Sequence, residues 1–234
     1  MSLLTVDIKE AGYKNKEPAI SNVHFALEQA SLTGMIGANG AGKSTTIKAI
    51  LGELPFLEGT IEMEEGTAYS YIPERPVYYD ELTLWEHFEF VGAVEQLGEG
   101  HLNYARELLK KFRLYERMHE FPGTFSKGMQ QKGMIALALF TGPRLLIIDE
   151  PFMGLDPSST RMLLELLDEE KNKGTGILMC THILDTAQRI CDSFIVIERG
   201  TVKAAGNLSE VLTQCGAGDG SLYSCITTED ELND

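Results

Sequence analysis

The chain has 234 residues, and 43% of them are hydrophobic, which suits one α/β domain with an inserted lobe or two small domains. A formal net charge of −15 argues against a nucleic-acid partner, which would need a basic patch, and against direct docking on anionic lipid. Four cysteines without metal-binding spacing fit a reducing cytosol, and no segment approaches the ~20 apolar residues of a membrane span. If the protein works at a membrane, another chain supplies the membrane part.

The first third of the chain is predicted to be rich in strands. Short apolar or alternating segments there are bounded by turn-forming residues. The predicted strands are residues 3–8, 19–27, 31–36, 58–63 and 68–72. A glycine-rich loop follows the third of them and runs into a helix that reaches residue 52. Pro73 and Pro76 then break the regular structure.

Residues 82–120 have a different pattern, because apolar residues such as Leu84 and Phe88 recur there at helical spacing. Two glycines, at positions 98 and 100, separate two predicted helices. We therefore expect an α-helical subdomain over about residues 78–138, inserted into an α/β domain.

The α/β pattern returns after residue 144. Continuous apolar runs occupy residues 145–148, 177–180 and 194–197. Strands that are apolar on both faces belong in a parallel sheet that helices cover. A helix over residues 157–173 is predicted between the first two runs, with Asp156 as its N-cap.

Residues 37–45 form the most informative motif, since they match the phosphate-binding pattern G-x-x-x-x-G-K-[ST] at every fixed position. They are Gly37, Ala38, Asn39, Gly40, Ala41, Gly42, Lys43, Ser44 and Thr45. The glycines let backbone N–H groups wrap the phosphates, and the following helix directs its positive end at them. Lys43 can reach the β and γ oxygens, and the Ser44 hydroxyl can ligate Mg²⁺. The pattern predicts a P-loop NTPase (RecA-like) core that binds a nucleotide.

Two more apolar strands end in groups that suit the same chemistry. Asp149 ends one of them, where a carboxylate can hold Mg²⁺, and the adjacent Glu150 can act as a general base on water. His182 follows another and could sense the γ-phosphate, although a capping or core histidine is the alternative. The remaining histidines fall in surface-like patterns: His24, His87, His101 and His119.

A second anion-binding helix terminus is predicted at Ser126. This residue can cap the helix that contains the apolar run 134–139, and Gly128 lies in its first turn. By composition alone an ordinary capped helix is the better interpretation.

Together these motifs resemble, in content and order, the nucleotide-binding subunit of an ATP-binding-cassette (ABC) transporter. The matching segments are 37–44 (Walker A), 145–149 (Walker B), 125–129 (signature), 154–156 (D-loop) and His182 (switch histidine). The resemblance covers about residues 3–205. Three segments, at 71–77, 125–132 and 181–195, are most similar to the ATPase subunits of Ecs-type bacterial exporters.

The resemblance implies a set of ligands. ATP and Mg²⁺ are the expected nucleotide and metal, with Ser44, Asp149 and Glu74 near the metal. Glu150, His182 and Lys43 are the expected catalytic groups. Tyr13 falls where the family stacks an aromatic ring on adenine, and a strand-end tyrosine without that role is the alternative.

The resemblance also implies partners. The ATP site is expected to be shared in a head-to-tail dimer with a second copy or a homologous ATPase, whose Ser126 and Gly128 would cover the nucleotide. A separate polytopic membrane subunit would hold the dimer at the cytoplasmic face of the membrane and would touch residues 74–95. An aromatic and apolar cluster there could instead be the core of the helical lobe: Tyr78, Tyr79, Leu82, Leu84 and Trp85.

The implied domain organisation is an N-terminal antiparallel β subdomain, the mostly parallel core and the helical insertion, together forming one ABC ATPase domain over residues 1–205. Residues 206–234 form a short C-terminal extension, expected to hold one helix at 208–212 and to be partly flexible.

Two departures from the family pattern carry charge. Glu74 stands at the position of the Q-loop glutamine, and Lys127 replaces a glycine of the signature, in which Met129 also replaces a glutamine. Ser126 and Gly128 remain, so we expect function to be kept. Lys127 is hypothesised to add a cation near the phosphates.

The sequence best supports a function as the energising subunit of a membrane exporter. A soluble ABC ATPase that remodels a protein or RNA complex is the alternative, but such proteins usually carry two cassettes or long coiled-coil arms, and this chain has neither pattern. A regulatory module without turnover is disfavoured by Asp149, Glu150 and His182, and a small-molecule kinase would not explain residues 125–130. The cargo is not encoded in this chain.

Overall fold

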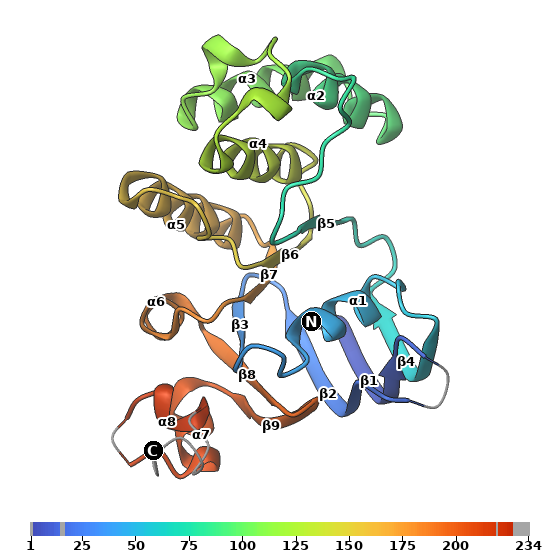
Figure 1. Ribbon diagram of the computed structural model, residues 1–234, viewed down its shortest axis with the longest axis vertical. Helices are drawn as coiled ribbons and strands as arrows, with labels where there is room; N and C mark the ends of the chain where they lie inside the picture. Colours follow the sequence, from blue (N-terminus) through green and yellow to red (C-terminus); the bar gives the residue numbers. More distant parts are fainter. Residues whose placement is uncertain (1, 15–16, 219, 227–234) are drawn as a thin grey trace. The chain divides into compact units, whose positions relative to one another are not determined.

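The computed structural model describes residues 2–14, 17–218 and 220–226 and divides into two compact units, which are described separately (Figure 1). The first unit comprises residues 1–67 and 170–234, and the second comprises residues 68–169. The boundary between them falls inside helix α5 (Pro157–Asn172).

An antiparallel sheet of three strands opens the first unit. Strand β1 (Ser2–Gly12) lies between β2 (Ile20–Glu28) and β4 (Phe56–Met63). The pairing aligns Val6 with Phe25 on one side and with Ile61 on the other. Side chains alternate between buried and exposed along β1, because successive residues of a strand point to opposite faces. The N-terminal antiparallel β subdomain of the prediction is confirmed.

Parallel strands form the centre of the first unit. Strand β3 (Leu32–Ile36) pairs in parallel with β7 (Gly176–Cys180) on one side and with β8 (Ser193–Glu198) on the other. All residues of β3 and β7 are buried, as their continuous apolar sequence predicts. Strand β9 (Thr201–Gly206), which the sequence analysis does not predict, pairs antiparallel with β8.

Among the described residues, four helices lie wholly within this unit: α1 (Lys43–Ile50), α6 (Leu184–Ile190), α7 (Leu208–Cys215) and α8 (Tyr223–Ile226). The helix predicted at 208–212 is therefore present and longer, whereas α6 and α8 are not predicted. Val211, Leu222 and Cys225 are buried against Ile36 and Phe194, so α7 and α8 share the core of the parallel strands. Residues 227–234 of the expected flexible tail lie outside the described residues.

The second unit joins a strand pair to a group of helices. Strand β5 (Tyr69–Ile72) pairs in parallel with β6 (Leu145–Asp149). Between them in sequence come α2 (Leu84–Val94), α3 (Glu99–Lys111), two 3₁₀ turns (Tyr115–Arg117 and Pro122–Thr124) and α4 (Lys127–Phe140). The rings of Phe88 and Phe140 meet edge to face, with centroids 5.2 Å apart, and hold α2 against α4.

His87 corrects one sequence interpretation, because it is buried on α2 instead of lying on the surface. Its Nε2 accepts a hydrogen bond from the Tyr79 backbone N–H at 3.0 Å, so its Nδ1 carries the proton and donates to the Thr83 carbonyl at 2.7 Å. A single histidine in an amphipathic helix gives no sign of which face it occupies, and the apolar stripe of α2 is wide enough to include it.

Within the described part of the chain, every helix is too short or too polar to span a lipid bilayer.

Candidate nucleotide site

The phosphate loop lies between β3 and α1 and owes its shape to glycines. Gly40 and Gly42 have φ angles of 79° and 114°, in a region that residues with a side chain rarely adopt. Gly42 is the N-cap of α1, and no side chain caps the first turn. The first N–H groups of a helix have no acceptor within the helix itself, so the N-terminus of α1 is suited to bind an anion.

Lys43 starts α1 and is folded back onto the loop that precedes it. Its side chain is nearly buried, and its Nζ donates to the carbonyl oxygens of Gly37 at 2.8 Å and Ala38 at 3.1 Å. A buried ammonium needs such acceptors, because its desolvation is costly. Phosphate oxygens entering the loop would offer this cation a charged acceptor instead.

The turn between β8 and β9, which comes much later in the sequence, supports the phosphate loop. The Gly200 N–H donates to the Ala41 carbonyl at 2.8 Å, and the Gly200 carbonyl accepts from the Ser21 N–H at 2.8 Å. Gly200, with a φ of 79°, lies in the tight turn between β8 and β9, and a Cβ there would lie 2.5 Å from the Ala19 carbonyl oxygen. The turn therefore links the phosphate loop to β2 through two backbone hydrogen bonds.

Tyr13 follows β1 and lies beside the phosphate loop, as the resemblance implies. Its hydroxyl is 3.3 Å from the Thr45 Oγ1, and the Lys48 Nζ lies 5.3 Å from the centre of its ring. About half of the side chain, 51%, is exposed, which leaves a ring face available for stacking.

His182 lies at the neighbouring strand end. Strands β3 and β7 run in parallel, so the phosphate loop after Ile36 and His182 after Thr181 leave the same edge of the sheet. Thr181 is fully buried, and its Oγ1 accepts from the Ile183 N–H at 3.1 Å, which turns the chain after His182. The imidazole itself is exposed. Within the first unit the structure therefore brings together Tyr13, the phosphate loop and the strand end that carries His182.

The two predicted acids lie in the second unit, at the end of β6. Asp149 is the last residue of the strand and is only 4% exposed. Glu150 follows with a φ of 48°, in the left-handed region that few residues other than glycine occupy. The backbone thus leaves the strand end sharply at Glu150.

The signature helix α4 begins where the sequence predicts its cap. The Ser126 Oγ accepts from the Met129 N–H at 3.3 Å, and the helix runs from Lys127, well before the apolar run 134–139. A Cβ on Gly128 would lie 2.6 Å from the Gly154 carbonyl oxygen, so only glycine allows this approach. The signature and the D-loop are therefore in contact within one unit.

The D-loop ends at Asp156, which caps α5. Its Oδ1 accepts from the N–H groups of Ser158 and Ser159 at 2.9 and 3.0 Å, and its Oδ2 lies 3.5 Å from the Lys132 Nζ of α4. Hydrogen bonds from Ser158 and Ser159 hold the pKa of the Asp156 carboxyl well below its usual range.

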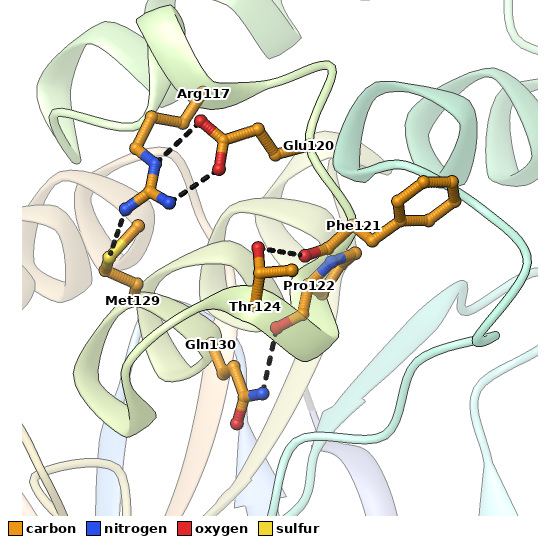
Figure 2. A network of polar contacts seen from close by, with 7 residues as sticks. All are labelled: Arg117, Glu120, Phe121, Pro122, Thr124, Met129 and Gln130. Carbon is orange, nitrogen blue, oxygen red and sulfur yellow. Dashed lines mark hydrogen bonds and ion pairs between the residues drawn. The ribbon is translucent and has the colours of Figure 1, made fainter.

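A side-chain network holds the start of α4 (Figure 2). Arg117 donates from Nε and Nη2 to both oxygens of Glu120, at 2.9 and 2.5 Å. It also donates from Nη1 to the Met129 sulfur at 3.4 Å and lies 5.2 Å from the centre of the Phe125 ring. Gln130 donates to the Pro122 carbonyl at 2.9 Å. Arg117 thus contacts the residues on both sides of Ser126–Gly128.

Arg117 is absent from the sequence-based prediction. The Arg-x-x-Glu spacing is visible in the sequence, but it marks only a local ion pair, and the contacts with Phe125 and Met129 depend on the fold. Its hydrogen bonds with Glu120 raise the pKa of the guanidinium and lower the pKa of the Glu120 carboxyl.

Tyr78 fixes the end of the segment that contains Glu74. Its hydroxyl donates to the Gln130 carbonyl at 2.6 Å, and a Cβ on Gly133 would lie 2.6 Å from that hydroxyl. Burial raises the pKa of Tyr78 far above its usual range. Glu74 itself is exposed and lines a cavity of about 440 Å³ together with Lys127 and Gln131.

Comparisons with known proteins agree with the motifs described above. The ABC transporter family model matches residues 20–153. The chain belongs to the ABC transporter family. The ABC-type transporter ATP-binding protein EcsA of Bacillus subtilis is 46% identical over 244 residues, which cover 98% of each chain. The uncharacterised ABC transporter ATP-binding protein YthP of the same organism is 45% identical, over 96% of this chain and 95% of its own.

A solved ATP-binding subunit of an ABC transporter has 41% sequence identity, a TM-score of 0.90 and full coverage of both chains. The resemblance to Ecs-type ATPase subunits and the P-loop NTPase fold are therefore confirmed. As a member of the ABC transporter family, the chain is an ATPase whose hydrolysis of ATP energises transport.

Proposed function

We propose that this chain is the energising subunit of a membrane exporter and that it binds two ATP molecules at the seam of a head-to-tail dimer. One observation carries the proposal. The signature Ser126 is an exposed helix cap that its own unit holds in place but does not cover. A second copy, or a homologous ATPase, would place this Ser126 and Gly128 over the nucleotide of its neighbour.

The first unit supplies the nucleotide contacts in this proposal. Gly37, Ala38, Asn39, Gly40, Ala41, Gly42, Lys43, Ser44 and Thr45 bind the phosphates, and Tyr13 stacks on the adenine. The Gly42 N-cap, which places the N-terminus of α1 at the loop, and the half-exposed Tyr13 ring support these roles. His182, on the adjacent strand end, would contact the γ-phosphate.

The residues fit a Mg²⁺ ion by their chemistry. Ser44 offers a hydroxyl oxygen, and Asp149 and Glu74 offer carboxylate oxygens, which are the ligands that Mg²⁺ prefers. A bound Mg²⁺ would neutralise charge on the β- and γ-phosphates. The chain's own part is to hold Asp149 at the buried end of β6, where the strand fixes its carboxylate.

Glu150 is proposed as the general base for the attacking water. Its left-handed backbone supports this role, since strained conformations of this kind cluster at functional sites. We expect Glu150→Gln to keep ATP binding, to lower turnover by about 100-fold or more and to trap an ATP-bound dimer. Turnover assays and size-exclusion chromatography with ATP test this.

The matched control is Glu165→Gln, an exposed glutamate on α5. It should leave both turnover and dimerisation unchanged. Normal hydrolysis by the Glu150→Gln protein would show that another group activates the water.

The partner at the membrane is proposed to be a separate polytopic subunit, which would place this chain at the cytoplasmic face. The second unit exposes apolar side chains after the Glu74 segment and on α2. These are Val77, Tyr79, Phe90 and Val94, with exposures of 72%, 58%, 46% and 61%. In contrast, Leu84 and Trp85 are buried in the lobe itself, so the predicted aromatic cluster divides between core and surface.

The acidic net charge supports a protein partner over a nucleic acid. We propose residues 1–205 as the ABC ATPase domain, with the helical subdomain over about 78–138, and residues 206–234 as the extension.

A further inference from the structure

The two charged departures from the family pattern face one cavity in the second unit. Its walls come from residues 74–76, from the first turns of α4 and from residues 153–154. Glu74 supplies the only carboxylate among the lining residues, and Lys127 supplies an ammonium from the opposite element. A cavity lined by opposite charges on two different elements is suited to an ion pair across it.

Gln131, which lines the same cavity, has a buried amide donor without an acceptor in the described part of the chain. It is 1% exposed, and its Nε2 has no hydrogen-bond partner among the described residues. A buried donor without an acceptor is rare in folded proteins. The cavity therefore contains a cation and an orphaned amide donor, and both would be satisfied by one carboxylate.

The position of the Glu74 segment makes that carboxylate available. The Tyr78 hydroxyl donates to the Gln130 carbonyl, which anchors the end of the segment on α4. Gln130 lies between Lys127 and Gln131 in the helix, and it lines the same cavity. Glu74, four residues before the anchor, is exposed and already lines the cavity that Lys127 and Gln131 share.

We propose that Lys127 and Gln131 are positioning residues that hold the Glu74 carboxylate in this cavity when no nucleotide is bound. The inference rests on the proposed function, in which Glu74 approaches the Mg²⁺ of bound ATP. Lys127 donates to one carboxylate oxygen and Gln131 to the other, so Glu74 must leave them before it reaches the metal. The resting enzyme thus keeps its extra negative charge away from the incoming nucleotide.

Arg75 also lines the cavity, but it belongs to the same segment as Glu74. Arg75 would move together with Glu74, so it does not favour the cavity position of the Glu74 carboxylate over the position near the metal. The proposed contact therefore depends on Lys127 and Gln131, which lie on helix α4.

Steady-state ATPase kinetics of the purified full chain test the proposal. We expect Lys127→Met to lower KM for MgATP about threefold with kcat nearly unchanged, because an exposed ion pair couples at most about fivefold. In a Glu74→Gln background the same substitution should no longer change KM. Lys110→Met, on α3 and paired with Glu107, is the control and should leave KM unchanged in both backgrounds.

A KM that rises in Lys127→Met would overturn the proposal, since it would show that the lysine binds the nucleotide phosphates. An effect of Lys127→Met that persists unchanged in the Glu74→Gln background would overturn it as well.

Thermal unfolding without nucleotide gives a second readout that does not need activity. We expect Lys127→Met and Gln131→Met each to lower Tm by about 1–3 °C, and to have no such effect in the Glu74→Gln background. A Tm that rises in Gln131→Met in both backgrounds would show that the amide has no partner and would refute its role. If the wild-type chain fails to hydrolyse ATP, the proposed function fails, while this unfolding cycle still reports on the Glu74 contact.

Discussion

The phosphate loop and the start of the signature helix, both proposed to contact ATP, are held in shape by different kinds of interaction. The loop is built almost entirely from backbone groups: glycines at 40 and 42, a helix N-terminus and the Gly200 contacts. The start of α4 depends on side chains from other segments, chiefly Arg117 and Tyr78. A site shaped by its backbone restricts which residue types can stand at each of its positions. A site held by side-chain contacts can receive those contacts from many different segments of the chain.

The largest expected effect is that of a substitution in the phosphate loop. Lys43→Ala removes the cation whose Nζ donates to two loop carbonyls, so the loop loses an internal hydrogen-bond donor together with the proposed phosphate contact. We expect kcat/KM for ATP to fall by about 100- to 1000-fold, as for the loss of one charge-stabilising donor. Turnover assays and nucleotide-binding titrations measure this.

Lys9→Ala is the control for Lys43→Ala, because Lys9 is an exposed lysine on β1 that pairs only loosely with Glu58. Its turnover should match that of the unmodified chain. Equal losses in both variants would mean that general charge, not the loop lysine, governs binding.

The next effect tests the contact between the signature and the D-loop. Gly128→Ala places a Cβ 2.6 Å from the Gly154 carbonyl oxygen, so one of the two segments must shift. We expect turnover to fall by about 10- to 100-fold with a smaller change in ATP binding, because misplacement by an ångström can cost that much.

Gly123→Ala is the matched control, since a Cβ there meets nothing within 4 Å. If the two alanine variants hydrolyse ATP equally fast, the close approach at Gly128 has no functional weight.

A smaller effect is expected from a substitution in the Arg117 side-chain network, and it measures how much that network contributes. Arg117→Ala removes the contacts with both Phe125 and Met129 but leaves the Ser126 cap in place. We expect turnover to fall by roughly two- to fivefold, the value of an exposed cation–π contact. Arg161→Ala, an exposed arginine on α5, should have no effect in the same assay. An Arg117→Ala protein with unchanged turnover would mean that the cap alone positions the signature.

The smallest effect concerns the charge on Asp156. Because its pKa is lowered in the fold, the ionised carboxylate contributes stability above its unfolded pKa of about 3.9, and this contribution is lost as the pH falls through the lower folded value. Asp156→Asn keeps an N-cap but removes the charge, so it should be slightly less stable at pH 7 and equal to the wild type at the acidic limit.

Denaturant midpoints measured from pH 7 down to about pH 2 test this prediction, because the loss begins only below the unfolded pKa. Asp80→Asn, at an exposed turn, serves as the control. A stability difference for Asp156→Asn that is independent of pH would assign the effect to hydrogen-bond geometry instead of charge.

The comparison also explains what the sequence could predict. Residues 37–45 were recognisable because each fixed position has a physical reason, in the backbone for the glycines and in the side chain for Lys43 and Ser44. The buried strands β3, β6 and β7 were recognisable because both their faces are apolar. Strand β9 and helix α6 were not predicted, since they are short and lack a clear period.

The supports of the site were harder to predict for a physical reason. Arg117 and Tyr78 act through contacts with α4, which become visible only when distant segments are packed together. Lys127 and Glu74 were noted separately in the sequence, and their common cavity depends on the path of the backbone between them.

The contact between Gly200 and Ala41 has a consequence for synthesis on the ribosome. The phosphate loop is translated early, but the turn that fixes it to β2 is translated about 160 residues later. A nascent chain that has not yet released this turn carries the whole nucleotide motif without its support. The phosphate loop therefore gains this backbone support only after the turn between β8 and β9 has left the ribosome.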